Sequence, residues 1–134
     1  MKFKIFTTLY IMKYDPNPIN SIYKVGITGN IEKRRADIQR TLSNQSLTVY
    51  WQGKFIFAYP IEQITHAFLA PFNVVMPPTV SGYTEFFDLN WVTAWILSKI
   101  FEAIMIARFI FAIVAIWVLL NWDYFLYKYN LLTQ

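Results

Sequence analysis

Four residues in the first third of the chain have side chains or backbone freedom that suit chemistry on a phosphate group: Tyr10, Lys24, Gly26 and Arg34. A phenol can accept a proton from water, and an amine close to it favours the charged phenolate. A guanidinium can stabilise the charge that builds on a phosphate during attack. Lys24 could instead bind a phosphate directly, and a tyrosine in a strand is on statistics alone a packing residue.

A hairpin followed by a helix would bring these residues together. Residues 5 to 13 and 22 to 28 have the pattern of two antiparallel strands, joined by Asp-Pro-Asn-Pro at 15 to 18. We expect Gly26 to supply a tight turn, and Asn30 to cap a helix over residues 31 to 42.

The helix over residues 31 to 42 is basic. Its apolar stripe is bordered by Arg34 and Arg35, while Lys33 and Arg40 point away from it. An arginine beside a buried face needs a carboxylate or a bound phosphate nearby, and periodicity does not choose between Arg34 and Arg35. The four cations could line a DNA phosphate track, or form a solvated face attracted to anionic lipid.

A second helix is predicted over residues 61 to 70, opened by Pro60 and closed by Pro71. Glu62 and His66 lie four apart and share one face of it. A strand over residues 47 to 59 precedes this helix, with Gly53 as a bulge or turn. A short strand at residues 83 to 89 follows it, where Glu85 is an exposed position or a partner for one arginine.

Several of these segments together resemble a known family. Leu9-Tyr10-Ile11 and Lys24-Val25-Gly26 are similar to the two short motifs of the GIY-YIG nuclease superfamily, and most closely to its phage-associated DNA-binding branch, whose second motif reads Lys-Ile-Gly. Arg34 follows Gly26 at the spacing of that family. Its Glu-x-x-x-His helix and Glu-Trp-Phe strand are matched by the segments 62–66 and 84–87. The first motif lacks its leading glycine, and Lys24 replaces the second tyrosine.

The resemblance implies a fold and a site. The fold would be α+β: a small GIY-YIG-like three-layer domain, with an antiparallel sheet of three or more strands and flanking helices. Glu62 would hold one divalent ion, Mg²⁺ or Mn²⁺, which keeps several waters and accepts few protein ligands. Tyr10 would act as base with Lys24 activating it, Arg34 would stabilise the transition state, and His66 would contact phosphate or orient water. Lys33, Arg35 and Arg40 would contact DNA.

The C-terminal part of the chain is far more apolar than this domain, and hydrophobic residues make up 56% of the whole sequence. Residues 103 to 122 are long enough to cross about 30 Å of hydrocarbon. Arg108 costs about 2.5 to 3.5 kcal/mol at the centre of a span, but the eleven Ile, Leu, Phe and Val residues return about 0.3 to 0.6 kcal/mol each. We therefore expect one transmembrane helix; the alternative is a buried helix that packs on the domain or on a second copy.

The distribution of charge predicts the orientation of that helix. Most Lys and Arg residues precede it, so the N-terminal domain is expected in the cytoplasm of a single-pass membrane protein. The expected organisation is a domain over residues 1–90, a connecting helix over 91–102, the transmembrane helix over 103–122 and a short tail over 123–134. Arg108 could snorkel, or bind a second copy or another membrane protein.

Three functions remain open from the sequence. The leading one is a membrane-anchored DNA-binding protein, phage-derived, that acts as a metal-dependent endonuclease. The second is a catalytically inactive module that keeps the fold and binds DNA or membrane lipid. The third is a small membrane protein, such as an exclusion factor or toxin, that acts through its apolar helix. The chain has no cysteine, which excludes disulfides and thiolate metal sites.

Overall fold

The computed structural model describes residues 7–15, 21–42 and 46–134. Residues 5 and 6 of the predicted first strand and the residues at 16–18 of the predicted loop lie outside these ranges. The chain forms two compact units that divide between Phe101 and Glu102, and each is described by itself.

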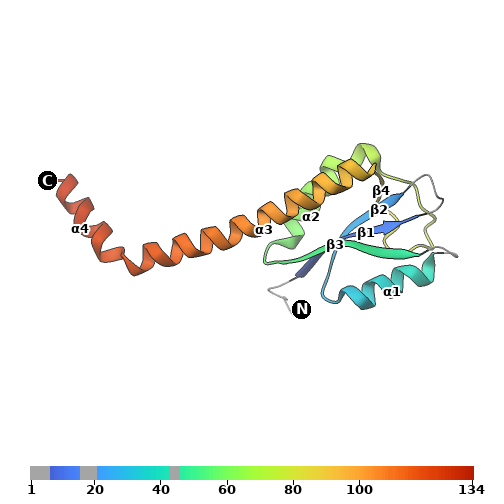
Figure 1. Cartoon of the computed structure of the whole chain (residues 1–134), viewed down its shortest axis with the longest axis horizontal. Coiled ribbons are helices and arrows are strands. Elements are labelled where there is room, and N and C mark those ends of the chain that lie inside the picture. Colours follow the sequence, from blue (N-terminus) through green and yellow to red (C-terminus); the bar gives the residue numbers. More distant parts are fainter. Residues whose placement is uncertain (1–6, 16–20, 43–45) are drawn as a thin grey trace. The chain divides into compact units, whose positions relative to one another are not determined.

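The first unit is built on a four-stranded antiparallel sheet in the order β3-β1-β2-β4. Strands β1 (Thr7–Tyr14) and β2 (Ile22–Thr28) form the expected hairpin, and β3 (Leu47–Phe55) and β4 (Phe86–Asp88) lie at the two edges. This α+β architecture confirms the predicted fold class (Figure 1).

The predicted irregularity in the third strand lies elsewhere than expected. Gly53 pairs regularly with Leu9, whereas the register shifts where Ile11 faces Trp51 and Met12 faces Val49. Tyr50 is therefore the extra residue of a bulge. The bulge was predicted at Gly53 because glycine is common at bulges, but the pairing register of the two strands decides where a bulge occurs.

Helix α1 (Ile31–Thr41) covers one face of the sheet. Asn30 caps it as predicted, because its side chain accepts a hydrogen bond from the backbone of Lys33 at 3.0 Å. The core on this face comes from alternate residues of the central strands and from the helix, and it includes Tyr10, Met12, Tyr14, Ile38, Leu42, Leu47 and Phe86.

Helix α2 (Ala58–Leu69) and the first turns of α3 (Trp91–Leu120) cover the other face (Figure 1). A 3₁₀ turn, η1 (Ala70–Phe72), follows α2. Asn90 begins α3 as expected, since it accepts a hydrogen bond from the Thr93 backbone at 2.8 Å. Ala94, Ser98 and Phe101 are buried at helical spacing, and the rings of Phe101 and Trp51 lie 5.3 Å apart. The first three turns of α3 thus belong to the sheet unit.

The short edge strand leaves part of β2 open. β4 pairs only with Ile22, Tyr23 and Lys24, so it stops before Val25. Helix α2 takes its place, because the His66 imidazole forms a hydrogen bond with the Val25 carbonyl at 2.8 Å. The residues that follow Lys24 on β2 can therefore be approached from α2.

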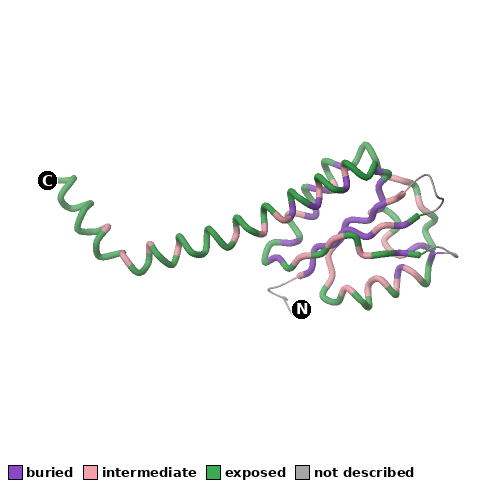
Figure 2. The backbone as a smooth tube through the Cα atoms, in the orientation of Figure 1, coloured by how far each residue is buried: buried purple, intermediate pink, exposed green. Residues whose placement is uncertain are grey.

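The second unit contains the rest of α3 and helix α4 (Trp122–Leu132). Its side chains are mostly exposed, in contrast to the buried strands of the first unit (Figure 2). α3 has 30 residues and a mean hydropathy of 2.7 in its most apolar 18-residue window, none of which is buried. By length and composition, α3 is able to cross a membrane.

Candidate functional site

The site begins where Tyr10 crosses over Gly26. The two residues are partners in the hairpin register, and the phenol of Tyr10 lies so close to Gly26 that an added Cβ would be 2.5 Å from its oxygen. Gly26 therefore lies inside β2 and does not form the predicted turn. Because Gly26 has no side chain, there is room for the buried ring of Tyr10 on the neighbouring strand β1.

Arg34 reaches this phenol from α1. Its Nε donates to the Tyr10 hydroxyl oxygen at 3.4 Å, and its Nη1 donates to the Ser81 hydroxyl at 3.1 Å. Arg34 is thus the arginine that faces the site. Arg35, its neighbour on α1, pairs instead with Glu32 at 3.9 Å.

Lys24 is fully buried and bound on several sides. Its Nζ donates to the Glu85 carboxylate at 2.5 Å and to the Gly82 carbonyl at 3.0 Å, and it lies 4.9 Å from the centre of the Phe86 ring. Lys24 was expected to activate Tyr10, whereas in the structure its amine binds Glu85 and the Gly82 carbonyl. The cation that hydrogen-bonds the phenol is Arg34, whereas Lys24 neutralises Glu85.

The loop before β4 holds these cations together. Gly82 has a φ of 66°, a left-handed conformation that glycine adopts without strain. A Cβ there would collide with the Lys24 amine and would lie 3.1 Å from the Arg34 guanidinium. Ser81 and Glu85 flank this glycine and contact Arg34 and Lys24 respectively.

Glu62 and His66 approach from α2 on the open edge of β2. Glu62 is only 5% exposed, and one of its oxygens, Oε2, is buried without a hydrogen-bond partner among the described residues. Its Oε1 accepts from Gln63 at 3.4 Å and lies 3.9 Å from Nδ1 of His66. A buried carboxylate oxygen without a partner is costly, so this position can receive a cation, a proton or water.

The pKa directions show that these groups form one electrostatic cluster. Burial raises the pKa of Tyr10 to about 12, against a lowering by Arg34, and Glu62 and Glu85 add to the rise. Burial also raises the pKa of Glu62, with Glu85 as a further cause and His66 opposing it. Burial lowers the pKa of Lys24, while Glu85 raises it. Two carboxylates, two cations and a phenol thus influence one another electrostatically, and Arg34 and Glu85 are only partly buried.

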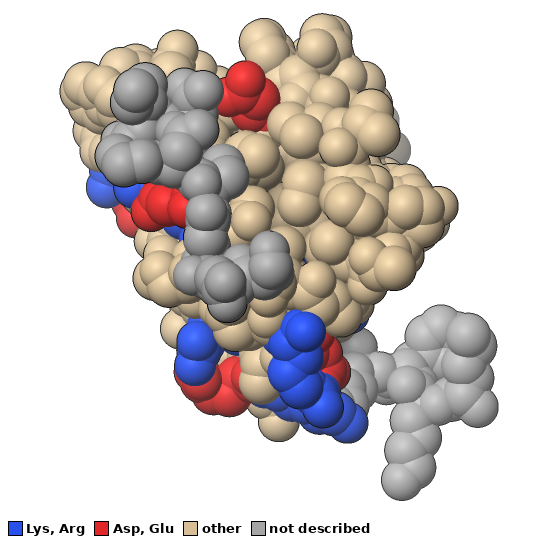
Figure 3. Space-filling model, turned by 90° about the vertical axis from the view of Figure 1, so that its right-hand side faces the viewer, with Lys and Arg blue, Asp and Glu red and all other residues tan. Residues whose placement is uncertain are grey.

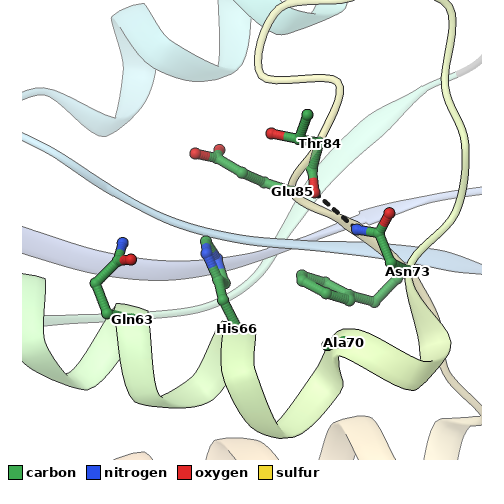
Figure 4. Close-up of a pocket in the computed structure, with 7 residues that line it drawn as sticks. Gln63, His66, Ala70, Asn73, Thr84 and Glu85 are labelled. Atoms are coloured by element: carbon green, nitrogen blue, oxygen red, sulfur yellow. Dashed lines mark hydrogen bonds between the residues drawn. The ribbon is translucent and has the colours of Figure 1, made fainter.

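Two hollows open beside this cluster. One, of about 340 Å³, is lined by residues of α2 and of the chain before β4, among them Gln63, His66, Asn73 and Glu85. Figure 4 shows Gln63 and His66 projecting from α2 and Glu85 entering from the loop. The other, of about 450 Å³, lies at the start of α1 and is lined by Thr28, Gly29, Asn30, Lys33, Arg34 and Asp37.

The remaining predicted DNA contacts lie on the outside of α1. Lys33 lines the hollow at the start of the helix, whereas Arg40 pairs with Asp37 and Arg35 with Glu32. Figure 3 shows basic and acidic side chains next to one another on one face of the protein, and large areas of that face carry no charge. The cations of α1 thus form a partly neutralised surface.

The fit of a divalent ion rests on Glu62. No group of three His, Cys, Asp or Glu side chains suited to a metal occurs within the described part of the chain. Mg²⁺, however, is commonly held by one or two carboxylates together with waters and substrate phosphates. The unpartnered Oε2 of Glu62, with Glu85 in electrostatic range, fits that kind of site.

Some residues of the cluster were missed in the sequence. Glu85 was expected to be an exposed strand position or a partner for arginine, yet it precedes β4 and binds Lys24. Ser81 and Gly82 had been given no role. The Ser-Gly pair is a loop signal, but nothing in its neighbours indicates contact with residues of β2 and α1.

Comparison with known proteins gives one family. The model of the T5orf172 domain matches residues 7–105, which is most of the chain. This finding corrects the GIY-YIG assignment, which the short motifs had suggested: the matching family is the T5orf172 domain and not GIY-YIG. No curated protein and no solved structure matches the chain. The family indicates a phage-associated DNA-binding or nuclease module.

Proposed function

The chain belongs to the T5orf172 domain family, and on this premise we propose that it is a membrane-anchored DNA-binding protein that hydrolyses DNA phosphodiesters with a divalent metal ion. The observation that carries the proposal is the buried, unpartnered Oε2 of Glu62 on α2, the helix whose His66 lines a hollow together with Glu85, the partner of Lys24. A purely structural core gains nothing from such a group.

The chain's own residues have distinct tasks in this proposal. Arg34 is held by Tyr10 and Ser81 with its guanidinium directed at the cluster, where it stabilises negative charge on a phosphate. Lys33 lies beside it at the start of α1 and neutralises a neighbouring phosphate. His66, fixed by the Val25 carbonyl, orients a water or a phosphate oxygen from the open edge of β2.

Tyr10 can accept a proton from water only as the phenolate, so its pKa must fall from the raised value for it to act as the base. With a pKa of about 12, the phenolate fraction at pH 7 is about 10⁻⁵. Glu62 would hold Mg²⁺ or Mn²⁺, which supplies Lewis-acid polarisation and reverses the electrostatic influence of that carboxylate on the phenol.

The anchoring part of the proposal rests on α3. This helix is long and apolar enough to span a bilayer, and the sheet unit reaches as far as Phe101 on the same helix. No linker is left between the unit and the span. The distribution of Lys and Arg favours the sheet unit on the cytoplasmic side, where it meets DNA.

The test is nicking of supercoiled plasmid by the full chain in lipid nanodiscs with Mg²⁺ or Mn²⁺. We expect Glu62→Gln and Arg34→Gln each to lower the rate by about 10² to 10³, the usual cost of removing a charge-stabilising group. Arg35→Gln is the matched comparison: that arginine lies next to Arg34 but pairs with Glu32, so as an outer DNA contact it should cost far less than Arg34→Gln. Nicking that survives both substitutions contradicts the proposed site.

A second function is favoured by a specific observation: Lys24 is already neutralised by Glu85, and the pKa of Tyr10 is raised. Both features suit a catalytically inactive module that binds DNA. Salt-sensitive DNA binding by the full chain, without metal-dependent nicking and unchanged in Glu62→Gln, is the outcome that selects it.

A further inference from the structure

Helix α2 buries two polar side chains and leaves several large apolar ones exposed. The face turned into the unit carries Glu62 and Thr65 along with Ala58 and Leu69. The adjacent face carries an apolar stripe at helical spacing that continues through η1: Phe57, Ile61, Ile64, Phe68 and Phe72. Phe57 is 71% exposed, Ile64 59% and Phe68 79%. A helix on the surface of a soluble domain has the reverse arrangement.

The surroundings of this stripe carry almost no charge. Between Phe55 and Thr84 the sequence contains a single Asp, Glu, Lys or Arg, which is the buried Glu62. An average segment of this length would contain about seven, at roughly 25% charged residues. Val75 and Tyr59 add further exposed apolar surface. A contiguous exposed apolar surface of this kind marks an interaction site.

The start of α3 has the same character. Trp91 and Trp95 lie one turn apart and are both more than half exposed, while Ala94 and Ser98 of the same turns are buried in the unit. α2 and these turns of α3 cover the same face of the sheet (Figure 1). Tryptophan and tyrosine are the side chains enriched at the level of lipid headgroups.

We infer that the outer face of α2, from Phe57 to Phe72, is an interfacial surface that lies in the headgroup region of the lipid bilayer. The inference rests on the anchoring in the proposed function. A 30-residue helix is about 45 Å long, whereas about 20 residues cross the hydrocarbon, so about ten residues of α3 remain outside it. Those residues are part of the sheet unit, which is therefore held at the bilayer surface.

Lipid is favoured over a protein partner by the chemistry of the surface. Protein interfaces have a polar rim that supplies hydrogen bonds and charge, with arginine among the enriched residues. The segment 55–84 offers no arginine or lysine for such a rim. The basic surface of α1 lies on the other face of the sheet, so Lys33 and the hollow that it lines with Arg34 are on the side away from α2.

The absence of cysteine allows a direct test with the full chain. Single cysteines at Ile64, Phe68, Ala36 and Ile113, all exposed positions, are labelled with a fluorophore in nanodiscs that hold one copy each. Quenching is measured in turn with lipids that carry a nitroxide just below the headgroup, which report on positions 64, 68 and 36, and with lipids that carry it deep in the acyl chain, which report on position 113. Ile113→Cys reports on the span, and Ala36→Cys on the outside of α1 is the matched control.

We expect strong quenching at positions 64 and 68, because an interfacial helix buries its apolar face about 5 to 10 Å below the headgroup boundary. Quenching at position 36 should be absent. The result at 64 and 68 should be the same in neutral and anionic lipid, since this face has no cation. Quenching at 113 but not at 64 and 68 overturns the inference and leaves the anchoring intact. No quenching at 113 overturns both, and quenching at 36 in anionic lipid assigns the bilayer contact to α1 instead.

Discussion

The two halves of the candidate site differ in how completely their polar groups are paired. On the α1 side, Lys24 hydrogen-bonds Glu85 and the Gly82 carbonyl, and Arg34 hydrogen-bonds Tyr10 and Ser81. On the α2 side, Glu62 keeps one buried oxygen without a partner in the described structure. A half whose polar groups are all paired is stable without a ligand, whereas a half with an unpaired buried oxygen is the one that a bound ligand would stabilise most. In the proposed function, the α1 side would supply the groups that act on phosphate, and the α2 side would bind the ion.

Glu62→Gln is expected to give the largest effect, with opposite signs for activity and stability. Plasmid nicking should fall by about 10² to 10³, while the free energy of unfolding at pH 7 should rise by about 1 to 3 kcal/mol, because a buried unpaired charge is removed. The pKa of Glu62 is raised on folding, so its carboxyl contributes stability at low pH that is lost as the pH rises through the folded pKa.

The stability gain of Glu62→Gln should therefore appear at neutral pH and vanish in acid. Thermal unfolding in detergent at several pH values measures it. Ala67→Gln, at an exposed position on the same helix, is the control. A loss of stability at pH 7 would show that the carboxylate is satisfied after all.

Glu85→Gln tests the complete half of the site. Lys24 then stays buried without its counter-charge, and removal of one partner of a buried pair costs about 3 to 5 kcal/mol, less here since Glu85 is partly exposed. The pKa of Lys24 is already lowered by burial, and loss of Glu85 lowers it further. Stability should then recover as the pH rises from that lowered pKa toward 10.5, because only the unfolded state still binds the proton.

Chemical denaturation between pH 7 and pH 10 follows this recovery. Asp88→Asn, an exposed carboxylate on the neighbouring strand, should leave stability nearly unchanged. Equal effects of Glu85→Gln and Asp88→Asn would show that the Lys24–Glu85 pair does not stabilise this half of the site.

Gly82→Ala should destabilise the same half by a different route. A left-handed backbone costs a residue with a Cβ about 1 to 2 kcal/mol, and the new methyl group meets the Lys24 amine. We expect the free energy of unfolding to fall by this amount. Arg34→Gln should also lower the nicking rate less in the Gly82→Ala background, since the loop no longer aligns the guanidinium. Thr79→Ala, an exposed position of the same loop, serves as control. An unchanged denaturation midpoint would mean that the loop tolerates the methyl group.

His66→Gln is expected to be the mildest change. It removes or lengthens the hydrogen bond to the Val25 carbonyl, which is worth about 0.5 to 1.5 kcal/mol. Hydrogen exchange of the backbone around Val25 should increase while Lys24 and its neighbours keep their protection. Equal loss of protection on both sides would show that the two halves act as one unit.

Much of the local structure could be predicted from the sequence. The hairpin, the cap at Asn30, the start of α3 after Asn90 and the apolar character of α3 follow from patterns within a few residues. The boundaries were less accurate, since the strand expected over residues 83 to 89 spans only Phe86–Asp88. The short motifs also suggested the GIY-YIG family, and this was wrong, since the T5orf172 domain matches residues 7–105.

The candidate residues were chosen in the sequence, but their partners were not. Arg34 does contact Tyr10, and Glu62 lies 3.9 Å from His66 on α2, while their catalytic and metal-binding roles remain predictions. Lys24 was placed beside the phenol by proximity along two strands, whereas its partner Glu85 lies 61 residues away. Which carboxylate reaches a buried amine depends on how a loop folds back over the sheet.

The sequence by itself determined the elements of this protein, since backbone hydrogen bonding and hydrophobic periodicity act over a few residues. It also determined the apolar length of α3. Only the tertiary structure decided that Gly26 makes room for Tyr10, that Lys24 is neutralised while Glu62 is not, and that α2 leaves Ile64 and Phe68 exposed. These features depend on which surfaces meet after the chain has folded, and burial changes the energy of a charge far more than its neighbours in sequence do.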